Sequence, residues 1–199
     1  MPKVVDHARR RDEIAFAACK AVARFGFDRL TLSRIAREAG CTTGMIAHYF
    51  ETKQDIILAA LRLISMRMET RLTKQLSGAK AGETSLAEIL GEALPIDAQR
   101  RIETTVWIGF WSHVASDPAI QKINMTVHEE WTDLIRRCVL AGWPELGERP
   151  EATRQAVCRS IHIFVNGLTA SAATSPHDWP AEDQITYLRD HLERLRRTV

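Results

Sequence analysis

Apolar residues recur at helical spacing along almost the whole chain, and no stretch shows sustained alternation of apolar and polar positions. The first such pattern ends at Gly26 and contains Ile14, Ala17, Ala18, Ala21, Val22 and Phe25. Capping residues, glycines and prolines delimit further helices predicted over residues 32–39, 43–49, 53–76, 85–94, 97–116, 118–141, 150–174 and 180–197. The sequence therefore predicts an all-α protein of about nine helices.

The chain is predicted to divide into two domains near residue 52. Three shorter helices precede this point, and the helix that begins at Lys53 is expected to belong partly to each domain. By composition, the clearest linker runs from Gly78 to Gly82. We therefore predict a first domain over residues 1–52 and a second domain over residues 53–199.

Charge is distributed unevenly, although the net charge of the chain is only +2. Residues 1–53 carry ten Lys or Arg against six Asp or Glu, so this part has a charge of +4 and the remainder a charge of −2. A basic N-terminal region followed by a mildly acidic remainder is typical of a region that binds phosphate groups. A solvated arginine-rich face would give the same excess of positive charge. The net negative charge of the rest of the chain argues against a protein that compacts DNA without sequence preference.

The four cysteines, Cys19, Cys41, Cys138 and Cys158, form no C-x-x-C motif, so neither a zinc ribbon nor a disulfide framework is predicted. We expect small buried side chains in a reducing compartment. The apolar run from Ile14 to Cys19 has six residues, which is too short for a secretion signal, and no segment is long enough to cross a bilayer. The expected location is the cytoplasm, with no membrane partner.

The segment from Leu30 to Lys53 has the outline of a helix-turn-helix. Thr31 is expected to cap the first helix, Gly40 to take a left-handed conformation at the corner, and Thr42 to cap the second helix. Seven residues are predicted to form its buried side: Leu32, Ile35, Ala36, Ala39, Cys41, Ile46 and Phe50. An α-hairpin with no nucleic-acid role would share this outline.

The other side of the second helix of this motif is small, polar or amphipathic, unlike the Glu and Lys mixture of a merely solvated face. Hydroxyl groups at a helix N-terminus are well placed to meet a phosphate, and small side chains allow the backbone to lie close in the major groove. The residues concerned are Thr42, Thr43, Gly44, Ala47, His48 and Tyr49. The sequence therefore favours a helix that reads duplex DNA.

The spacing I-A-x-x-A-G-x-x-x-G-x-I-x-x-Y-F-x-x-K, from Ile35 to Lys53, resembles the N-terminal domain of the TetR family of transcriptional regulators. The resemblance covers roughly residues 10 to 62. It implies phosphate contacts by Thr31, His48, Tyr49 and Lys53, and an approach to bases by Thr42, Thr43 and Gly44. Ala47 departs from the family, in which many members have Tyr, so one contact is expected to be missing. The basic run Arg9-Arg10-Arg11 is either a further backbone or minor-groove contact or a solvated helix start.

Apolar stripes on the last two predicted helices indicate a dimer interface, and the resemblance implies the same pairing. The final helix has an a/d seam of Ile185, Leu188, Leu192 and Leu195, and the preceding helix has a stripe of Val157, Ile161, Phe164 and Leu168. The alternative is that both stripes pack inward on their own chain. A two-fold dimer would place two recognition helices one turn of DNA or somewhat more apart on a palindromic operator.

The C-terminal part is similar to the BetI-type subgroup of this family, whose members respond to choline. The similarity rests on V-W-I-G-F-W-S-H-V-A-S-D-P-A-I and F-V-N-G-L. Aromatic faces and one carboxylate suit a quaternary ammonium ion. The predicted effector-binding residues are therefore Glu103, Trp107, Phe110, Trp111, Trp131 and Asn166. Thr169 replaces a Trp that is frequent in the subgroup, and we favour an apolar or aromatic effector in the same pocket over a cation.

The competing hypothesis is a helical enzyme or metalloprotein with no DNA role. Cys158 and His162 lie one turn apart on one helix, but two ligands are too few for a metal site. No phosphate loop, nucleophile elbow or paired-carboxylate motif occurs. We therefore expect no enzymatic activity, metal or cofactor, and predict a ligand-responsive regulator, most simply a repressor, that binds operator DNA as a homodimer and is released by a small molecule.

Overall fold

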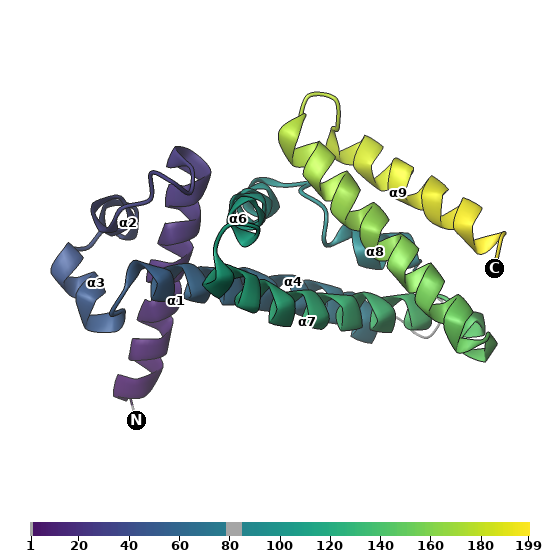
Figure 1. Ribbon diagram of the computed structural model, residues 1–199, viewed down its shortest axis with the longest axis horizontal. Helices are drawn as coiled ribbons and strands as arrows, with labels where there is room; N and C mark the ends of the chain where they lie inside the picture. The colour runs from purple at the N-terminus through teal and green to yellow at the C-terminus, as the bar shows by residue number, and fades with distance from the viewer. Residues whose placement is uncertain (1, 79–84) are drawn as a thin grey trace. The chain divides into compact units, whose positions relative to one another are not determined.

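The computed structural model describes residues 2–78 and 85–199, and within them the side chains of residues 7–77, 85–118 and 120–199. The described chain contains nine α-helices, one 3-10 helix and no strand (Figure 1). The helices are α1 Pro2–Phe25, α2 Leu32–Ala39, α3 Thr43–Tyr49, α4 Lys53–Gly78, α5 Leu86–Gly91, α6 Ala98–Val114, α7 Pro118–Gly142, η1 Pro144–Glu148, α8 Glu151–Thr174 and α9 Ala181–Arg196. The prediction of an all-α fold is confirmed.

Local capping fixes the ends of α2 and α3. The Thr31 hydroxyl accepts the N–H of Arg34 at 3.3 Å, and the Thr42 hydroxyl accepts the N–H of Met45 at 3.1 Å. Gly40 has φ 61° and ψ 37°, and its N–H closes the last turn of α2. This left-handed conformation costs glycine little, because it has no Cβ to clash. These boundaries agree with those predicted.

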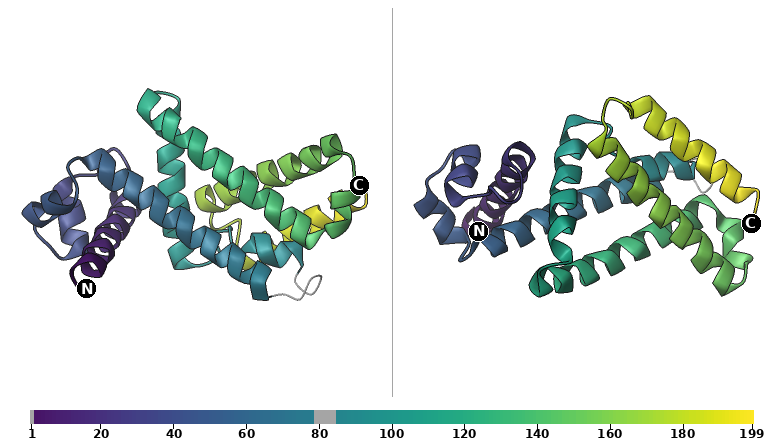
Figure 2. Two further views of the ribbon diagram at one scale, coloured as in Figure 1. Left: turned by 90° about the horizontal axis from the view of Figure 1, so that it is seen from below. Right: turned by 45° about the horizontal axis from the view of Figure 1, so that its top comes forward.

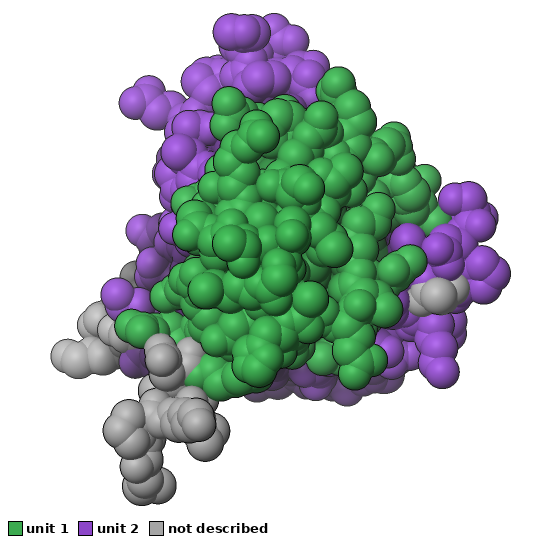
Figure 3. Space-filling view, turned by 90° about the vertical axis from the view of Figure 1, so that its left-hand side faces the viewer, with its two compact units in different colours: residues 1–67, 105–113 green, residues 68–104, 114–199 purple. Residues whose placement is uncertain are grey.

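The chain forms two compact units, and each is described by itself. Unit 1 contains Met1–Arg67 and Thr105–His113 and appears in green in Figure 3. Its core joins α1 to the helix-turn-helix and to the start of α4. Eight of its fully buried side chains are Ile14, Cys19, Ile35, Ile46, Ile56, Leu61, Ile64 and Phe110. α2 packs on α1, and α3 packs on α2.

Unit 2 contains Met68–Thr104 and Val114–Val199. In this unit α5 packs against α7 and α9, and α7 packs against α8. Figure 2 shows α8 and α9 side by side, joined by a short turn. The core includes Leu90, Leu94, Ile135, Val139, Ile161, Val165 and Leu188. Since α5, α7, α8 and α9 each contribute an apolar face to this core, the unit is a helical bundle.

Several local predictions differ from the structure. α1 begins at Pro2, well before the first apolar position on which its prediction rested, because the mostly polar stretch from Asp6 to Glu13 separates this start from the apolar pattern. Leu32 is 39% exposed, so it does not belong to the buried side of the helix-turn-helix, and Cys41 is only half-buried. The helix η1 was not predicted. It follows Trp143 and buries Leu146.

The predicted linker Gly78–Gly82 lies outside the described residues except for Gly78, which ends α4. The functional boundary at residue 52 stays a prediction. By contacts, the first half of α4 and the last part of α6 belong to unit 1, so both helices contribute to both units. None of the described helices combines the length and the apolar character needed to cross a membrane.

Candidate DNA-binding interface and effector region

The helix α3 is anchored by its apolar side and presents its other side to solvent. Ile46 is fully buried, and Phe50, which ends the helix, is 5% exposed. The remaining face is exposed, and it carries Thr43, Gly44, Met45, Ala47 and His48. A short exposed helix that contains a glycine and an alanine can approach the floor of a major groove closely. The geometry is that of a recognition helix.

Two arginines of α1 hold α3 in place. Arg10 forms an ion pair with Glu13 at 2.6 Å, and its second nitrogen donates to the sulfur of Met45 at 3.4 Å. Arg11 donates to the backbone carbonyl of Tyr49, and its guanidinium lies 4.3 Å from the centre of the Phe50 ring. These two members of the basic run therefore position the recognition helix. Sequence spacing gave no sign of these contacts, which join residues at least 35 positions apart.

Three rings meet at the C-terminal end of α3. The ring of His7, on α1, lies 4.7 Å from that of Tyr49 and 6.4 Å from that of His48. His48 and Tyr49 are 5.3 Å apart in an edge-to-face arrangement. Tyr49 is half-buried, whereas both histidines are exposed. His7 was not among the predicted site residues, because it lies far from the motif in the sequence.

The junction between α3 and α4 is fixed by a reciprocal cap. The N–H of Thr52 donates to the Asp55 carboxylate at 2.9 Å, and the N–H of Asp55 donates to the Thr52 hydroxyl at 3.1 Å. This is a capping box with Asp in place of Glu. Lys53 is half-buried at the first position of α4. All seven predicted DNA-binding residues thus lie in unit 1: Thr31, Thr42, Thr43, Gly44, His48, Tyr49 and Lys53.

The predicted effector residues fall into separate groups. In unit 1 the ring of Trp107 lies 5.8 Å from Phe110 and 6.3 Å from Trp111. Phe110 is fully buried in the core, and Trp111 is 37% exposed. In unit 2 the indole N–H of Trp131 donates to the side-chain oxygen of Asn166 at 3.1 Å. Each group therefore has contacts of its own, and the effector site stays a prediction.

The predicted acidic effector residue, Glu103, already has partners. It is 4% exposed, and its carboxylate accepts from Arg71 at 2.8 Å and from Gln99 at 3.0 Å. A network continues through Glu92, which pairs with Arg100 at 2.6 Å. A buried carboxylate needs such compensation, because an unpaired charge is costly in the interior. A cation would have to compete with Arg71 for this group.

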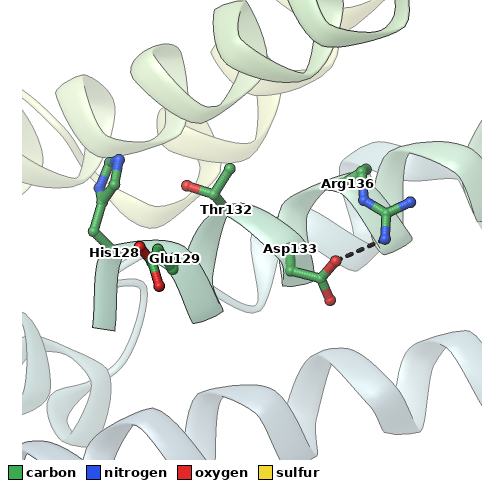
Figure 4. Close-up of a pocket in the computed structure, with 5 residues that line it drawn as sticks. All are labelled: His128, Glu129, Thr132, Asp133 and Arg136. Atoms are coloured by element: carbon green, nitrogen blue, oxygen red, sulfur yellow. Dashed lines mark hydrogen bonds and ion pairs between the residues drawn. The ribbon is translucent and has the colours of Figure 1, made fainter. Parts of the chain in front are cut away.

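A shallow groove runs along α7 in unit 2 and is lined by His128, Glu129, Thr132, Asp133 and Arg136 (Figure 4). The dashed line in Figure 4 joins Asp133 to Arg136 at 2.7 Å. That hydrogen bond holds the pKa of Asp133 below its usual value. The groove is open, and its lining side chains are all of polar or charged residues, whereas the pockets that take small ligands are enclosed.

A histidine pair lies beside this groove. His162 on α8 is 6% exposed, its ring lies 5.0 Å from His128, and its Nδ1 is 3.3 Å from the Thr132 hydroxyl. Burial, and secondarily the nearby His128, lower the pKa of His162. In the part of the chain that the structure describes, no three His, Cys, Asp or Glu side chains are grouped as a metal site would require. Burial also raises the pKa of the Cys138 thiol to about 11, so this thiol is unreactive.

Most of the predicted dimer stripe faces inward. Val157, Ile161, Leu168, Leu188 and Leu192 are each at most 5% exposed and lie in the core of unit 2. Phe164, Ile185 and Leu195 are partly buried against the same core. The alternative of inward packing therefore describes the single chain, because α8 and α9 must cover α5 and α7 before they can meet a partner. The accessible apolar side chains of these two helices include Ile163, 66% exposed, and Tyr187, 47% exposed.

The exposed, capped α3 on its supporting α1 and α2 defines a helix-turn-helix DNA-binding protein. Residues 14–60 match the family described as bacterial regulatory proteins, tetR family, and residues 82–197 match BetI-type transcriptional repressor, C-terminal. This chain belongs to the TetR family of transcriptional regulators and has a C-terminal domain of the BetI type. It is a regulator that binds DNA through its helix-turn-helix, and it is not an enzyme. The resemblance inferred from the sequence is confirmed.

Individual relatives agree with this assignment. The chain is 26% identical over 198 residues to the HTH-type transcriptional regulator BetI of Escherichia coli (strain SMS-3-5 / SECEC), which covers 96% of this chain and 98% of BetI. It is 28% identical over 113 residues to the HTH-type transcriptional regulator PksA of Bacillus subtilis (strain 168), which covers 57% of this chain and 55% of PksA.

Solved structures share the fold. A putative transcriptional regulator from Saccharomonospora viridis, crystallised in complex with choline, superimposes with a TM-score of 0.79 at 22% identity, over 94% of this chain and 96% of the other. A transcriptional regulator from Rhodococcus sp. Rha1 gives a TM-score of 0.77 at 22% identity, with the same shares covered. The similarity extends over both units of the chain.

Proposed function

We propose that this chain is a homodimeric repressor that binds a palindromic operator and is released from it by a small-molecule effector. The observation that carries the proposal is the exposed face of α3, which is capped by Thr42 and held from behind by Arg10 and Arg11. A helix fixed in this way is already ordered before it enters a groove, so binding does not cost the conformational entropy of ordering it. BetI, similar over nearly the whole chain, supports the same role.

Phosphate and base contacts divide along this surface. Thr31, His48, Tyr49 and Lys53 are assigned to the DNA backbone, and Thr42, Thr43 and Gly44 to the approach to base edges. Thr42 already accepts the N–H of Met45, but its hydroxyl hydrogen is still available to donate. Lysine contributes mainly to salt-dependent affinity, whereas a threonine at a base edge contributes to sequence preference.

Dimerisation is assigned to the outer faces of α8 and α9. Ile163 and Tyr187 are exposed large apolar side chains on these helices. Gly167 lies one turn after Ile163, and a Cβ added there would meet nothing within 4 Å. A small residue beside an exposed isoleucine allows two helices to approach closely. This outer face therefore replaces the inward stripe as the expected interface.

The effector is assigned to the aromatic groups of the helical domain. In unit 2 the Trp131–Asn166 pair offers a ring face and a polar anchor, and in unit 1 Trp107 and Trp111 offer ring faces of their own. The choline bound to the regulator from Saccharomonospora viridis supports a quaternary ammonium ligand. The pairing of Glu103 with Arg71 supports an apolar or aromatic ligand, because the carboxylate is already neutralised. Choline is the first compound to test.

Release requires that the effector bind one conformation more tightly than the other. The helices α4 and α6 contribute residues to both compact units. They are therefore the elements through which a ligand can affect the two helix-turn-helix motifs of the dimer. A small change in the separation of the two recognition helices misaligns them with the two half-sites of the operator, whose spacing is fixed. Repression and its relief then follow from one equilibrium.

A footprint on the DNA upstream of the gene for this chain tests the proposal. We expect protection of two half-sites related by a two-fold axis, and loss of protection when choline or an aromatic compound is added. Tyr49→Phe and Lys53→Ala should each weaken binding, and Lys53→Ala should also make the salt dependence shallower by about one counterion. Absence of any sequence-selective protection by the wild-type protein at modest salt would overturn the proposal.

A further inference from the structure

The histidine on α1 and the histidine on α3 lie on the same exposed edge of the DNA-binding unit. His7 packs its ring against Tyr49 at 4.7 Å, and His48 meets the edge of the same Tyr49 ring at 5.3 Å. The two imidazoles are 6.4 Å apart, although their residues are 41 positions apart in the sequence. Both are exposed, so the ring nitrogens are accessible from solvent.

The two arginines that follow His7 on α1 already have partners within the protein. On α1, Arg10 is paired with Glu13, and Arg11 is bound to the Tyr49 carbonyl and the Phe50 ring. On α3, the neighbouring titratable group is the Tyr49 phenol. Among the described residues, no hydrogen bond or ion pair joins His7 or His48 to a carboxylate. Within the described side chains, neither imidazole is paired with a carboxylate, and a charge gained there would be compensated best by an external anion.

We propose that His7 and His48 form a paired imidazole contact with the phosphate backbone of the operator, so that DNA binding takes up protons and strengthens at mildly acidic pH. The inference rests on the proposed function and adds His7 to the DNA-binding surface. Tyr49 is the spacer that holds both rings at one edge. The ligand is the phosphodiester backbone, and the contact carries no base preference.

The physical basis is the difference between the free and bound states. In the free protein, solvent offers the two exposed imidazoles no fixed negative charge. A phosphate placed next to them favours the charged form, because a charged imidazole donates a charge-assisted hydrogen bond to an anionic oxygen. Histidine is the side chain that gains its charge between about pH 5 and 8. The complex therefore binds more protons than the separate components.

The experiment measures operator affinity between pH 8.0 and pH 5.5 at constant salt. Each proton taken up per subunit steepens the dependence of affinity on pH by about tenfold per pH unit. For the wild-type protein we expect affinity to rise at least severalfold over this range. The slope of affinity against salt should become steeper at low pH by up to about 0.9 for each phosphate newly neutralised.

Two substitutions at His7 separate charge from packing. His7→Gln removes both the ring and the charge, whereas His7→Phe keeps a ring against Tyr49 and removes only the charge. Both should lose about half of the pH dependence, so at pH 5.5 each should bind the operator more weakly than the wild-type protein. His48→Gln should lose the other half. His177→Gln, an exposed histidine in unit 2, is the matched control and should retain the full wild-type response.

The outcomes are distinguishable. If the wild-type protein binds no operator at pH 8, the proposed function fails. If it binds at pH 8 with an affinity and salt slope that do not change down to pH 5.5, the paired contact alone is refuted. A pH dependence that is unchanged in His7→Gln and His7→Phe would likewise remove His7 from the surface. Thermal melting of each variant at both pH values verifies that the compared proteins are folded.

Discussion

At the scale of single residues, burial sets the behaviour of His162. Its pKa is lowered first by loss of hydration and then by the adjacent His128. At pH values well above about 6.5 the imidazole is neutral in both the folded and the unfolded chain, and it contributes nothing to pH dependence. Below that value the unfolded chain binds a proton that the folded chain resists. Stability is therefore lost as the pH falls from about 6.5 towards the lowered pKa.

We predict that replacement of this histidine flattens the acid sensitivity of the fold. In the wild-type protein the thermal midpoint should fall between pH 7.5 and pH 5.5, and in His162→Gln it should fall less. His191, whose pKa is also lowered by burial, accounts for part of the remaining decline. His177→Gln is the exposed control. An identical decline in all three proteins would contradict the assigned role of burial.

Gly44 is a residue at which stability and DNA binding should respond in opposite directions. A Cβ added there would lie 3.8 Å from the Thr42 hydroxyl, which is an ordinary contact. Gly44→Ala should therefore stabilise the protein, by up to about 1 kcal/mol, through a smaller loss of backbone entropy. The same methyl group stands on the face assigned to the groove, so operator affinity should fall. Chemical denaturation and DNA titration of the same preparation measure both effects.

At the scale of the element, α3 is too short to be stable alone, and its first turn depends on one hydroxyl. The Thr42 side chain accepts the Met45 N–H, whereas the neighbouring Thr43 side chain makes no capping contact. Two threonines that are adjacent in the sequence therefore have different tasks. One fixes the helix, and the other is available to the DNA.

The two alanine substitutions should separate these tasks. Thr42→Ala removes the cap and should lower the free energy of unfolding by about 1 kcal/mol. Thr43→Ala should leave stability within about 0.5 kcal/mol and relax base preference at one operator position. Denaturation curves and sites selected from a random DNA pool provide the two measurements. Equal destabilisation by both substitutions, or the same selected sequence for Thr43→Ala and wild type, would refute the division.

At the scale of the whole molecule, a buried ion pair connects α4 with α6 in unit 2. Glu103 is nearly inaccessible, and Arg71 is its charged partner at 2.8 Å. Arg71→Met leaves the carboxylate uncompensated and should destabilise the protein by about 3–5 kcal/mol. The double variant Arg71→Met with Glu103→Leu should recover most of this loss, because no charge remains buried.

The matched control for that prediction is a solvent-exposed pair in the same unit. Arg136 and Asp133 are about half exposed and lie 2.7 Å apart. Arg136→Met should cost no more than about 1 kcal/mol, because water and salt screen such pairs. Urea denaturation of the four proteins measures the difference. A double variant as unstable as Arg71→Met alone would show that packing, and not the buried charge, is responsible.

Assembly is the second property of the whole molecule. Gly167→Arg places a long charged side chain in open space on the outer face of α8, where it does not disturb the single chain. We predict that this variant is monomeric by sedimentation and binds the operator much more weakly than wild type. Thr126→Arg, at an exposed position on α7, is the control for added charge. A Gly167→Arg protein that remains dimeric would place the interface elsewhere.

Much of this molecule could be predicted from its sequence, because the deciding interactions are local. The caps at Thr31, Thr42 and Thr52, and the left-handed Gly40, involve residues within five positions of one another. The boundaries of α2 and α3, and with them the helix-turn-helix, followed from such features. The seven residues assigned to DNA could also be named without a structure, because the resemblance to the TetR family implies their roles.

The tertiary structure alone decided what each helix face meets. Periodicity showed that Val157, Ile161 and Leu188 share apolar faces, but only the packed bundle placed those faces inside their own chain. It also paired Glu103 with Arg71 and brought His7 against Tyr49, across 32 and 42 positions. The spacing of residues along a helix determines which of them point the same way. Which surface they point at depends on the packing of distant segments, and local spacing carries no information about that.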